Sequence, residues 1–366
     1  MRRSPISIAI PLISLFAGIL ACQVVQLEGP ARLSPQNADE FIERGNAYFD
    51  AGDLDLAISD FSQAIQLEPD FAEAYYNRAN TYKAKGELDR AIRDYDQAIK
   101  LNPDFLKAYI NRGLVHAHNG DPNRAIHDYD RAIQLDPDYA DTYFNRGISY
   151  VAIGELDRAI RDYEQVLQLE PEAADAFYNR GLAYFAKGEP DLAIRDFDRA
   201  IQLEPNAADA YTSRGLAYAS QGDQERAIDD YDRAIELNPN LVIAYINRGE
   251  AFQAKGDVER ALRDFERAIR DLNRTLQINS NDAAAYNNRG YAYYAMGDLE
   301  QAISDINHSI QLAPAVADAY FNRGIIFNDK GEREYAIADF QKVLELCANS
   351  PLCQEARQEL EVPVVK

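Results

Sequence analysis

One phrase recurs nine times along this chain, between residues 38 and 350. It reads approximately A-x-A-Y-x-N-R-G-x-A-Y-x-x-x-G-x-x-x-x-A-I-x-D-Y-x-x-A-I-x-L-x-P, and successive copies are 34 residues apart at every step but one. A fixed period of this length is typical of stacked arrays, in which each unit buries its apolar face against its neighbours. We therefore expect no single central core, although 366 residues would ordinarily suggest two or three globular domains.

Within each unit, large and small side chains occupy fixed positions. Position 4 is aromatic and position 20 is alanine in all nine copies, and position 24 is Phe or Tyr except at Ile306. Position 8 is glycine in eight copies and Ala79 in the second, which lets the two helices of a hairpin approach closely. Position 15 is glycine throughout and predicts the end of the first helix. Proline at position 32 closes seven copies and predicts the end of the second helix.

This alternation resembles the tetratricopeptide repeat family over about residues 38–350. The resemblance implies an all-α fold: a right-handed superhelical solenoid of about nine helix–turn–helix repeats with a C-terminal capping helix. The repeats are expected at residues 38–71, 72–105, 106–139, 140–173, 174–207, 208–241, 242–282, 283–316 and 317–350. The more polar stretch 351–361 predicts the capping helix, and 362–366 is a short tail.

The seventh repeat is seven residues longer than the others. From Gly249 to Gly290 the spacing is 41, because the run 264–270 (DFERAIR) is followed by the similar run 271–277 (DLNRTLQ). Seven residues are close to two helical turns, so the apolar stripe keeps its direction. We expect the second helix of this repeat to be about two turns longer and to project past its neighbours.

Two charged positions repeat without exception. Position 7, where the family favours an aliphatic residue, is arginine in all nine copies, and position 23 is aspartate in all nine. This repetition predicts a ladder of ion pairs between first and second helices, because guanidinium–carboxylate geometry suits a half-buried site. The alternative is a row of arginines that awaits acidic partners.

Position 6 is asparagine in seven of the nine copies. In the family, first helices line the concave wall of the superhelix, and position 6 faces that groove. Asparagine carries both a donor and an acceptor, so a row of asparagines can hold the backbone of an extended peptide. The alternative is a helix–helix or capping bond that was copied with the unit. With bulky residues at position 5, the expected peptide-binding groove comprises Asn77, Asn111, Asn145, Asn179, Asn247, Asn288, Asn322, Tyr76, Phe144, Tyr178 and Phe321.

Charge limits the class of partner. The 60 Asp and Glu residues outnumber the 38 Lys and Arg residues, for a net charge of −22. Nucleic acid is not expected as a partner, because its phosphates need Lys and Arg to neutralise them. Position 2, which faces the groove, is mostly acidic, unlike the basic clamp with which some family members bind acidic C-termini. A basic or neutral protein segment, extended or helical, fits this rim better.

The first residues have the features of an export signal: two arginines, an apolar run over Ile6–Ala21, and a small residue before Cys22. The ending Gly-Ile-Leu-Ala-Cys resembles the lipobox of bacterial lipoproteins, in which the cysteine is acylated after cleavage. The resemblance implies a signal peptide over 1–21, a tether over 22–37, and a lipid anchor on the cell membrane or outer membrane, facing outward or into the periplasm. The alternatives are an uncleaved anchor and an ordinary signal peptide.

No motif for catalysis, a metal or a cofactor emerges from the sequence. His116 replaces a packing tyrosine and is expected in the core rather than as a metal ligand. Cys347 and Cys353 form an even pair if Cys22 is acylated, and we expect either a disulfide or two buried thiols.

These features together favour a non-catalytic scaffold for protein–protein interaction, lipid-anchored in a bacterial cell envelope, with extended segments in its groove. The alternative is an assembly factor or holdase for a membrane protein complex. An enzyme or small-molecule binder is not expected.

Overall fold

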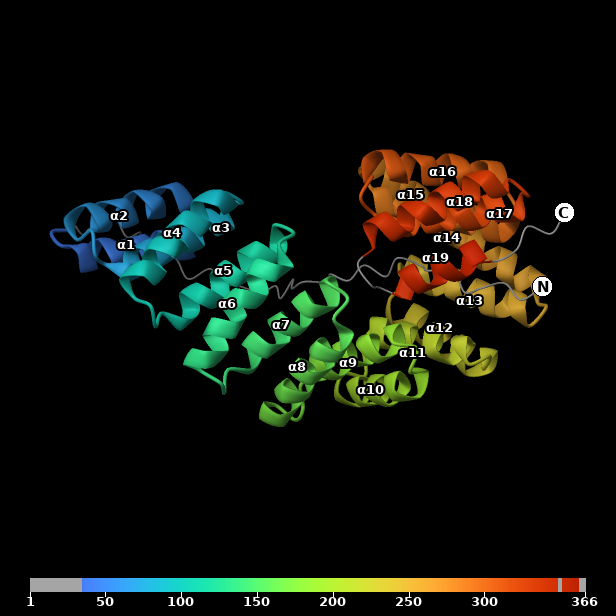
Figure 1. Cartoon of the computed structure of the whole chain (residues 1–366), viewed down its shortest axis with the longest axis horizontal. Helices are drawn as coiled ribbons and strands as arrows, with labels where there is room; N and C mark the ends of the chain where they lie inside the picture. The colour runs from blue at the N-terminus through green and yellow to red at the C-terminus, as the bar shows by residue number, and fades with distance from the viewer. Residues whose placement is uncertain (1–34, 348–350, 362–366) are drawn as a thin grey trace. The chain divides into compact units, whose positions relative to one another are not determined.

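The computed structural model describes residues 35–347 and 351–361 (Figure 1). Within these ranges the chain forms nineteen α-helices and no strand, which confirms the predicted all-α fold. The expected signal peptide over 1–21, the acylated Cys22, most of the tether and the 362–366 tail lie outside the described residues. None of the described helices is both long and apolar enough to span a bilayer.

Each repeat contributes two helices, and the second is the longer one except in the eighth repeat, where α15 and α16 both have 14 residues. The first helices are α1 (Ala38–Asp50), α3 (Ala72–Ala84), α5 (Leu106–His118), α7 (Ala140–Ala152), α9 (Ala174–Ala186), α11 (Ala208–Ser220), α13 (Val242–Ala254), α15 (Ala283–Met296) and α17 (Ala317–Asp329). The second helices are α2 (Leu54–Leu67), α4 (Leu88–Leu101), α6 (Pro122–Leu135), α8 (Leu156–Leu169), α10 (Pro190–Leu203), α12 (Gln224–Leu237), α14 (Val258–Ile278), α16 (Leu299–Leu312) and α18 (Arg333–Leu346). The capping helix is α19 (Pro351–Glu361).

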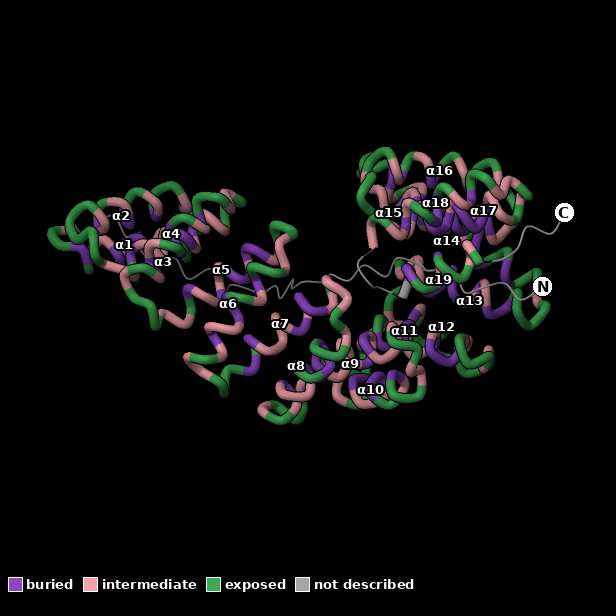
Figure 2. The backbone as a smooth tube through the Cα atoms, viewed as in Figure 1, coloured by how far each residue is buried: buried purple, intermediate pink, exposed green. Residues whose placement is uncertain are grey.

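The described helices divide into two compact units, α1 to α7 and α8 to α19. In the first unit, α1 pairs with α2, α3 with α4, and α5 with α6, and each second helix also packs on the next first helix. In the second unit, the same order of packing runs from α9 to α19. Buried segments recur along successive helices, and the buried side chains form a series of small clusters between neighbouring helices rather than a central core (Figure 2).

Glycine at position 8 is required by the aromatic ring at position 24. A Cβ atom added to Gly215 would lie 2.6 Å from Cε1 of Tyr231, and one added to Gly249 would lie 2.6 Å from Cε1 of Phe265. Real Cβ atoms do not approach ring carbons this closely, so a larger residue would push the two helices of the hairpin apart. The predicted close approach is confirmed.

Glycine at position 15 has a different physical basis. All nine of these glycines, from Gly52 to Gly331, have positive φ angles between 76° and 88°. This left-handed conformation ends the first helix, and an L-residue with a side chain adopts it at a cost.

The repeated arginine and aspartate form the predicted ladder of ion pairs. In the sixth repeat, Arg214 Nε donates to Asp230 Oδ2 at 2.8 Å and Arg214 Nη2 donates to Asp230 Oδ1 at 2.6 Å. The guanidinium also lies over the rings of Tyr211 and Tyr218, at 5.5 Å and 5.9 Å from their centroids. The other pairs that show this contact are Arg44–Asp60, Arg78–Asp94, Arg112–Asp128, Arg180–Asp196, Arg248–Asp264, Arg289–Asp305 and Arg323–Asp339.

The same arginines bind a third group, which the sequence analysis did not anticipate. Nη1 of Arg214 donates to Asp198 in the preceding repeat at 2.5 Å, so one side chain joins three helices. The acceptors in the other repeats are Ser62, Asp96, Asp130, Asp232 and Asn307, all at the same position 25, and Asn273 seven residues after position 25 in the longer α14. Position 25 is polar in every copy, and this regularity could have predicted the third partner of the arginines.

The second helix of the seventh repeat is longer, as predicted, with 21 residues in α14 against 14 in α12 and α16. Its added two turns are packed on their inner face. Leu272 and Leu276 are buried with Ala285 of α15. The last residue of the helix, Ile278, has 90% of its surface exposed.

The capping helix covers the last repeat with its apolar side. Leu352, Cys353 and Ala356 are buried, and a disulfide joins Cys353 to Cys347 at the end of α18. The predicted core position of His116 is also confirmed, because only 6% of its surface is exposed.

Candidate protein-binding face

The predicted binding residues lie on the first helices, which contact one another in sequence within each unit. In the first unit α1, α3, α5 and α7 are consecutive neighbours, and in the second unit α9, α11, α13, α15 and α17 are. We call the surface made by positions 2, 5, 6 and 9 of these helices the first-helix wall. Each unit has its own stretch of this wall.

In the first unit the asparagines of position 6 have two kinds of bond. Asn111 Nδ2 donates to the Tyr76 hydroxyl and to Asn80 Oδ1, both at 2.9 Å, so it links α5 to α3. Asn145 Nδ2 donates to the carbonyl oxygen of Asp141, one turn earlier in its own helix, at 2.8 Å. Both asparagines remain partly exposed, as does Asn77.

In the second unit the predicted asparagines are less alike. Asn179 repeats the bond of Asn145, with Nδ2 donating to the carbonyl of Asp175 at 2.8 Å, and both Asn179 and Asn288 are partly exposed. Asn247 and Asn322 are each only 2% exposed. The predicted row of equivalent, accessible amides is therefore interrupted.

Three residues that were predicted to line the groove are buried and do not belong to its accessible surface: Asn247, Asn322 and Phe321. Asn322 Nδ2 donates to Asn287 Oδ1 at 3.2 Å, which ties α17 to α15. The Phe321 ring, fully buried, packs against Phe340 of α18 in the cluster that the capping helix closes. Asn247 lies in α13, which has a first helix packed on either side.

The remaining aromatic residues of position 5 keep part of their surface open. The Tyr76 ring packs at 4.8 Å from Phe105, and the Tyr178 hydroxyl lies 3.3 Å from Ser213 Oγ of the next first helix. Phe144 is also partly exposed. Half-buried aromatic rings beside free amide groups are typical of protein-binding surfaces.

Acidic groups border this wall. Asp39, Glu73, Asp141, Asp175 and Asp209 are all exposed residues of position 2. Partial desolvation by neighbouring side chains raises the pKa of the Asp209 carboxyl above its ordinary value, although the residue lies at the surface.

A second unpaired acid lies at position 9 of the seventh repeat. Burial raises the pKa of the Glu250 carboxyl to about 8, although part of the side chain remains exposed.

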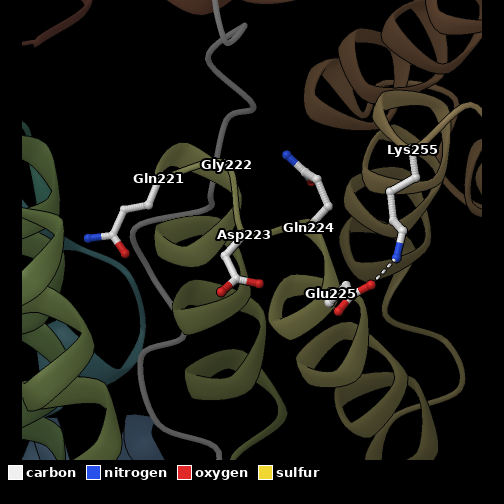
Figure 3. A pocket seen from close by; sticks show the side chains of 6 residues that line it. All are labelled: Gln221, Gly222, Asp223, Gln224, Glu225 and Lys255. Carbon is white, nitrogen blue, oxygen red and sulfur yellow. Dashed lines mark hydrogen bonds and ion pairs between the residues drawn. The ribbon is translucent and has the colours of Figure 1, made fainter.

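A shallow hollow opens where the α11–α12 turn faces the α13–α14 turn (Figure 3). It is lined by Gln221, Gly222, Asp223, Gln224, Glu225 and Lys255, and Lys255 Nζ donates to Glu225 Oε1 at 2.9 Å. Its polar groups are exposed, so it has none of the enclosed apolar surface that small-molecule sites use.

No three His, Cys, Asp or Glu residues in the described part of the chain are arranged to hold a metal ion. Burial lowers the pKa of His116, which keeps this imidazole neutral in the core.

Comparison with known families agrees with the repeat geometry. Profiles described as "TPR repeat" match residues 45–86 and 215–256. Profiles described as "Tetratricopeptide repeat" match 72–105, 106–139, 144–202, 197–229, 263–320 and 317–350. The chain belongs to the tetratricopeptide repeat family. Members of this family are generally non-catalytic and mediate protein–protein interaction.

Solved structures similar to this chain include a tetratricopeptide repeat protein from Parabacteroides merdae ATCC 43184, at 22% identity and a TM-score of 0.50, over 69% of this chain and 98% of that one. MamA is 32% identical with a TM-score of 0.43, over 45% of this chain and 96% of that one. YrrB, described as a TPR protein with an unusual peptide-binding site, is 26% identical with a TM-score of 0.45, over 50% and 95%. No protein of curated function matches the chain.

Proposed function

We propose that this protein is a non-catalytic scaffold that binds extended protein segments along its first-helix wall. The observation that carries the proposal is the pair of amides at Asn145 and Asn179. Each uses one N–H on its own helix and makes no other hydrogen bond to the described residues. The second N–H and the carbonyl oxygen of each amide are available to a peptide backbone, which offers one acceptor and one donor per residue.

The neighbouring aromatic rings supply affinity. Phe144 and Tyr178 stand directly before these asparagines in the sequence and are partly exposed. An apolar side chain of the bound segment would cover such a ring and remove its surface from water. The acidic residues of position 2 favour a segment that is basic or neutral.

We further propose that the protein is held on a bacterial envelope membrane, facing outward or into the periplasm, by acyl chains on Cys22. The support is the sequence alone: a basic start, an apolar run and a lipobox-like ending. An anchor with more than one acyl chain gives stable attachment, whereas one chain alone gives marginal attachment.

The groove proposal is tested by the double variant Asn145→Ala/Asn179→Ala, which removes one amide from the first-helix wall of each unit. Peptides selected from a random library on the wild-type protein should bind the double variant about fivefold or more weakly, whichever unit they use, because one amide offers two hydrogen bonds of about 0.5–1.5 kcal/mol each. Asn123→Ala, on an exposed face of α6, is the matched control. Unchanged affinity in the double variant, with unchanged helical content, would reject the assignment.

The anchor is tested by metabolic labelling with a fatty-acid analogue in a bacterial host. We expect the label on the protein, its processing to stop with globomycin, and both label and membrane retention to disappear in Cys22→Ala. A labelled Cys22→Ala protein would show that the lipid is elsewhere, and an unlabelled wild type would leave the anchor proposal without basis.

A further inference from the structure

Position 9 of the second repeat departs from the pattern of the repeats after it. Asn80 stands there in α3, whereas the four repeats that follow carry aliphatic side chains at this position: Leu114, Ile148, Leu182 and Leu216. Asn80 lies on the first-helix wall and keeps part of its surface exposed. An amide in a row of aliphatic side chains gives up hydrophobic burial, so its polar contacts decide what it does.

Asn80 is the centre of a hydrogen-bonded network that joins α3 to α5. Its Oδ1 accepts from the hydroxyl of the buried Tyr95 at 2.6 Å and from Asn111 Nδ2 at 2.9 Å. Asn111 Nδ2 also donates to the Tyr76 hydroxyl at 2.9 Å, and the Tyr76 ring packs 4.8 Å from Phe105. We call Tyr76, Asn80 and Asn111 the amide cluster. Its hydrogen bonds fix both amide groups in place before any ligand binds.

The third repeat shows that the array folds without such a network. Tyr129 takes the place of Tyr95 there, and Leu114 takes the place of Asn80. The Tyr129 hydroxyl is buried and makes no hydrogen bond within the described ranges. Asn145, which follows Leu114 along the wall, donates to the carbonyl of its own helix instead. The fold therefore tolerates leucine at position 9 and does not require the amide of Asn80.

The amide cluster leaves one donor group and one acceptor open to solvent. Asn80 Nδ2 and Asn111 Oδ1 make no hydrogen bond to the residues that the structure describes, and neither atom is buried. Turning both amides over would exchange their roles and again leave one NH2 group and one carbonyl oxygen. The two open atoms belong to side chains joined by a 2.9 Å hydrogen bond, so one ligand group can reach both.

We infer that the amide cluster recognises a carboxamide side chain, glutamine or asparagine, in a bound extended segment. This inference rests on the proposed function, since it names a side chain of the segment that the wall binds. The ligand carbonyl accepts from Asn80 Nδ2 and the ligand NH2 group donates to Asn111 Oδ1, which closes a ring of three amides. The Tyr76 hydroxyl accepts from Asn111 and holds that amide in position.

Other groups of a peptide match the two open atoms less well. A backbone peptide group is trans, so its N–H and C=O point in opposite directions, whereas a primary carboxamide carries both on one edge. A carboxylate only accepts, and it would face Asn111 Oδ1 without a donor. Lys107, one turn before Asn111 in α5, is the charge that would favour a carboxylate, so the test includes glutamate.

Selection from a random peptide library displayed on phage tests the inference. Three full-length proteins are compared: the wild type, Asn80→Leu and the control Asn46→Leu. Asn46 occupies position 9 of the first repeat, is exposed, and makes no side-chain hydrogen bond to the described residues. We expect Gln or Asn at one fixed place in the peptides selected on the wild type and on the control, and no such preference on Asn80→Leu.

A synthetic peptide from the wild-type selection gives the quantitative test. Replacing its carboxamide residue by norleucine should weaken binding to the wild type about tenfold, because two hydrogen bonds are lost, and should cost much less on Asn80→Leu. Replacement by glutamate should weaken binding at least as much. These peptide changes are read on the wild type, so they do not depend on how well a variant folds. In an NMR titration, the carboxamide peptide should shift the side-chain NH2 signals of Asn80 and Asn111, and the norleucine peptide should not.

Three results would overturn the inference. Peptides that depend on Asn145 or Asn179 but have no fixed Gln or Asn, or keep it on Asn80→Leu, would leave the binding function standing and remove this site. Equal or tighter binding of the glutamate peptide would show that the cluster prefers a carboxylate. If the wild type selects no peptide, both the function and the site are wrong.

Discussion

At the scale of single residues, the repeated arginine does more than pair with one aspartate. Arg214 joins α11 to α12 through Asp230 and to the preceding repeat through Asp198, and two aromatic rings cover its faces. Because the guanidinium presents its donors in a fixed planar fork, a single residue type can satisfy all three helices. Burial of the pair makes it costly to lose one partner.

Arg214→Lys should therefore destabilise the protein although the charge is kept. Lysine cannot reproduce two parallel hydrogen bonds and a third to Asp198, and we expect a loss of about 1–3 kcal/mol, measured as a lower urea midpoint. Lys255→Ala, which removes an exposed ion pair with Glu225, is the control and should change the midpoint little. Equal urea midpoints for Arg214→Lys and the wild type would mean that the guanidinium hydrogen bonds of the ladder do not contribute to stability.

The residue-scale predictions succeeded where both partners lie within one repeat. Arg214 and Asp230 are sixteen residues apart in a hairpin whose geometry the period already implies. The third partner, Asp198, belongs to the stacking of one repeat on the next, and the packing of separate hairpins is not encoded in any local pattern. The exposure of Asn145 and the burial of Asn247 differ for the same reason.

At the scale of elements, α14 shows how a duplicated heptad is accommodated. The first copy keeps the contacts within its own repeat, through Phe265 and Asp264. The second copy serves the next repeat, with Asn273 accepting from Arg289 and Leu272 buried near α15. In the other repeats one heptad makes both the contacts within the repeat and those with the next repeat. In α14 these two sets of contacts are made by two successive heptads.

Deleting residues 271–277 should leave a folded array. The deletion restores the 34-residue spacing and leaves Glu266, at position 25, to replace Asn273 as the acceptor for Arg289, and a seven-residue change rotates the helix by only about 20°. Removing five residues, 271–275, is the control, since it turns the apolar stripe away by about 140°. Circular dichroism and urea unfolding should show cooperative unfolding for the seven-residue deletion and a lower urea midpoint for the five-residue deletion. If the seven-residue deletion is the less stable of the two, the two heptads do not have the separate contacts described above.

The capping helix carries a pH-dependent contact. Burial, with Asp318 and Glu359 nearby, raises the pKa of Glu355 from 4.5 to about 7, and its Oε2 is buried without a partner. A raised folded-state pKa means that the folded protein holds a proton that the unfolded chain releases between these values. Stability from this group is thus complete below pH 4.5 and is lost as pH rises to about 7.

Glu355→Gln should remove this part of the pH dependence. Urea midpoints measured from pH 4.5 to 8 should converge at the acid end and favour the variant at the alkaline end. Glu361→Gln, at the exposed end of the same helix, is the control. A Glu355→Gln profile parallel to that of the wild type would show that the carboxyl is already solvated.

At the scale of the whole molecule, the net charge of −22 opposes folding while the ladder supports it. Repulsion between exposed acids is screened by salt over about 10 Å at 0.1 M, whereas the half-buried arginine pairs are screened much less. Salt therefore weakens the repulsion between exposed acids more than it weakens the ion pairs of the ladder.

Added salt should therefore stabilise the protein. We expect the urea midpoint to rise between 10 and 200 mM NaCl and then level off, because repulsion is screened first. Sodium sulfate, matched in ionic strength, separates screening from its stronger effect on apolar burial. A midpoint that falls with NaCl would mean that exposed ion pairs dominate the stability.

The sequence by itself determined the hairpin, because every contact within it depends on residues at fixed short distances. The helix boundaries, the left-handed glycines, the close approach of Gly215 to Tyr231 and the ion pair of Arg214 with Asp230 all follow from the 34-residue phrase. Only the tertiary structure decided what happens between hairpins. It buried Asn247, Asn322 and Phe321 and gave Arg214 its third acceptor, since burial and stacking depend on neighbours that no single repeat contains.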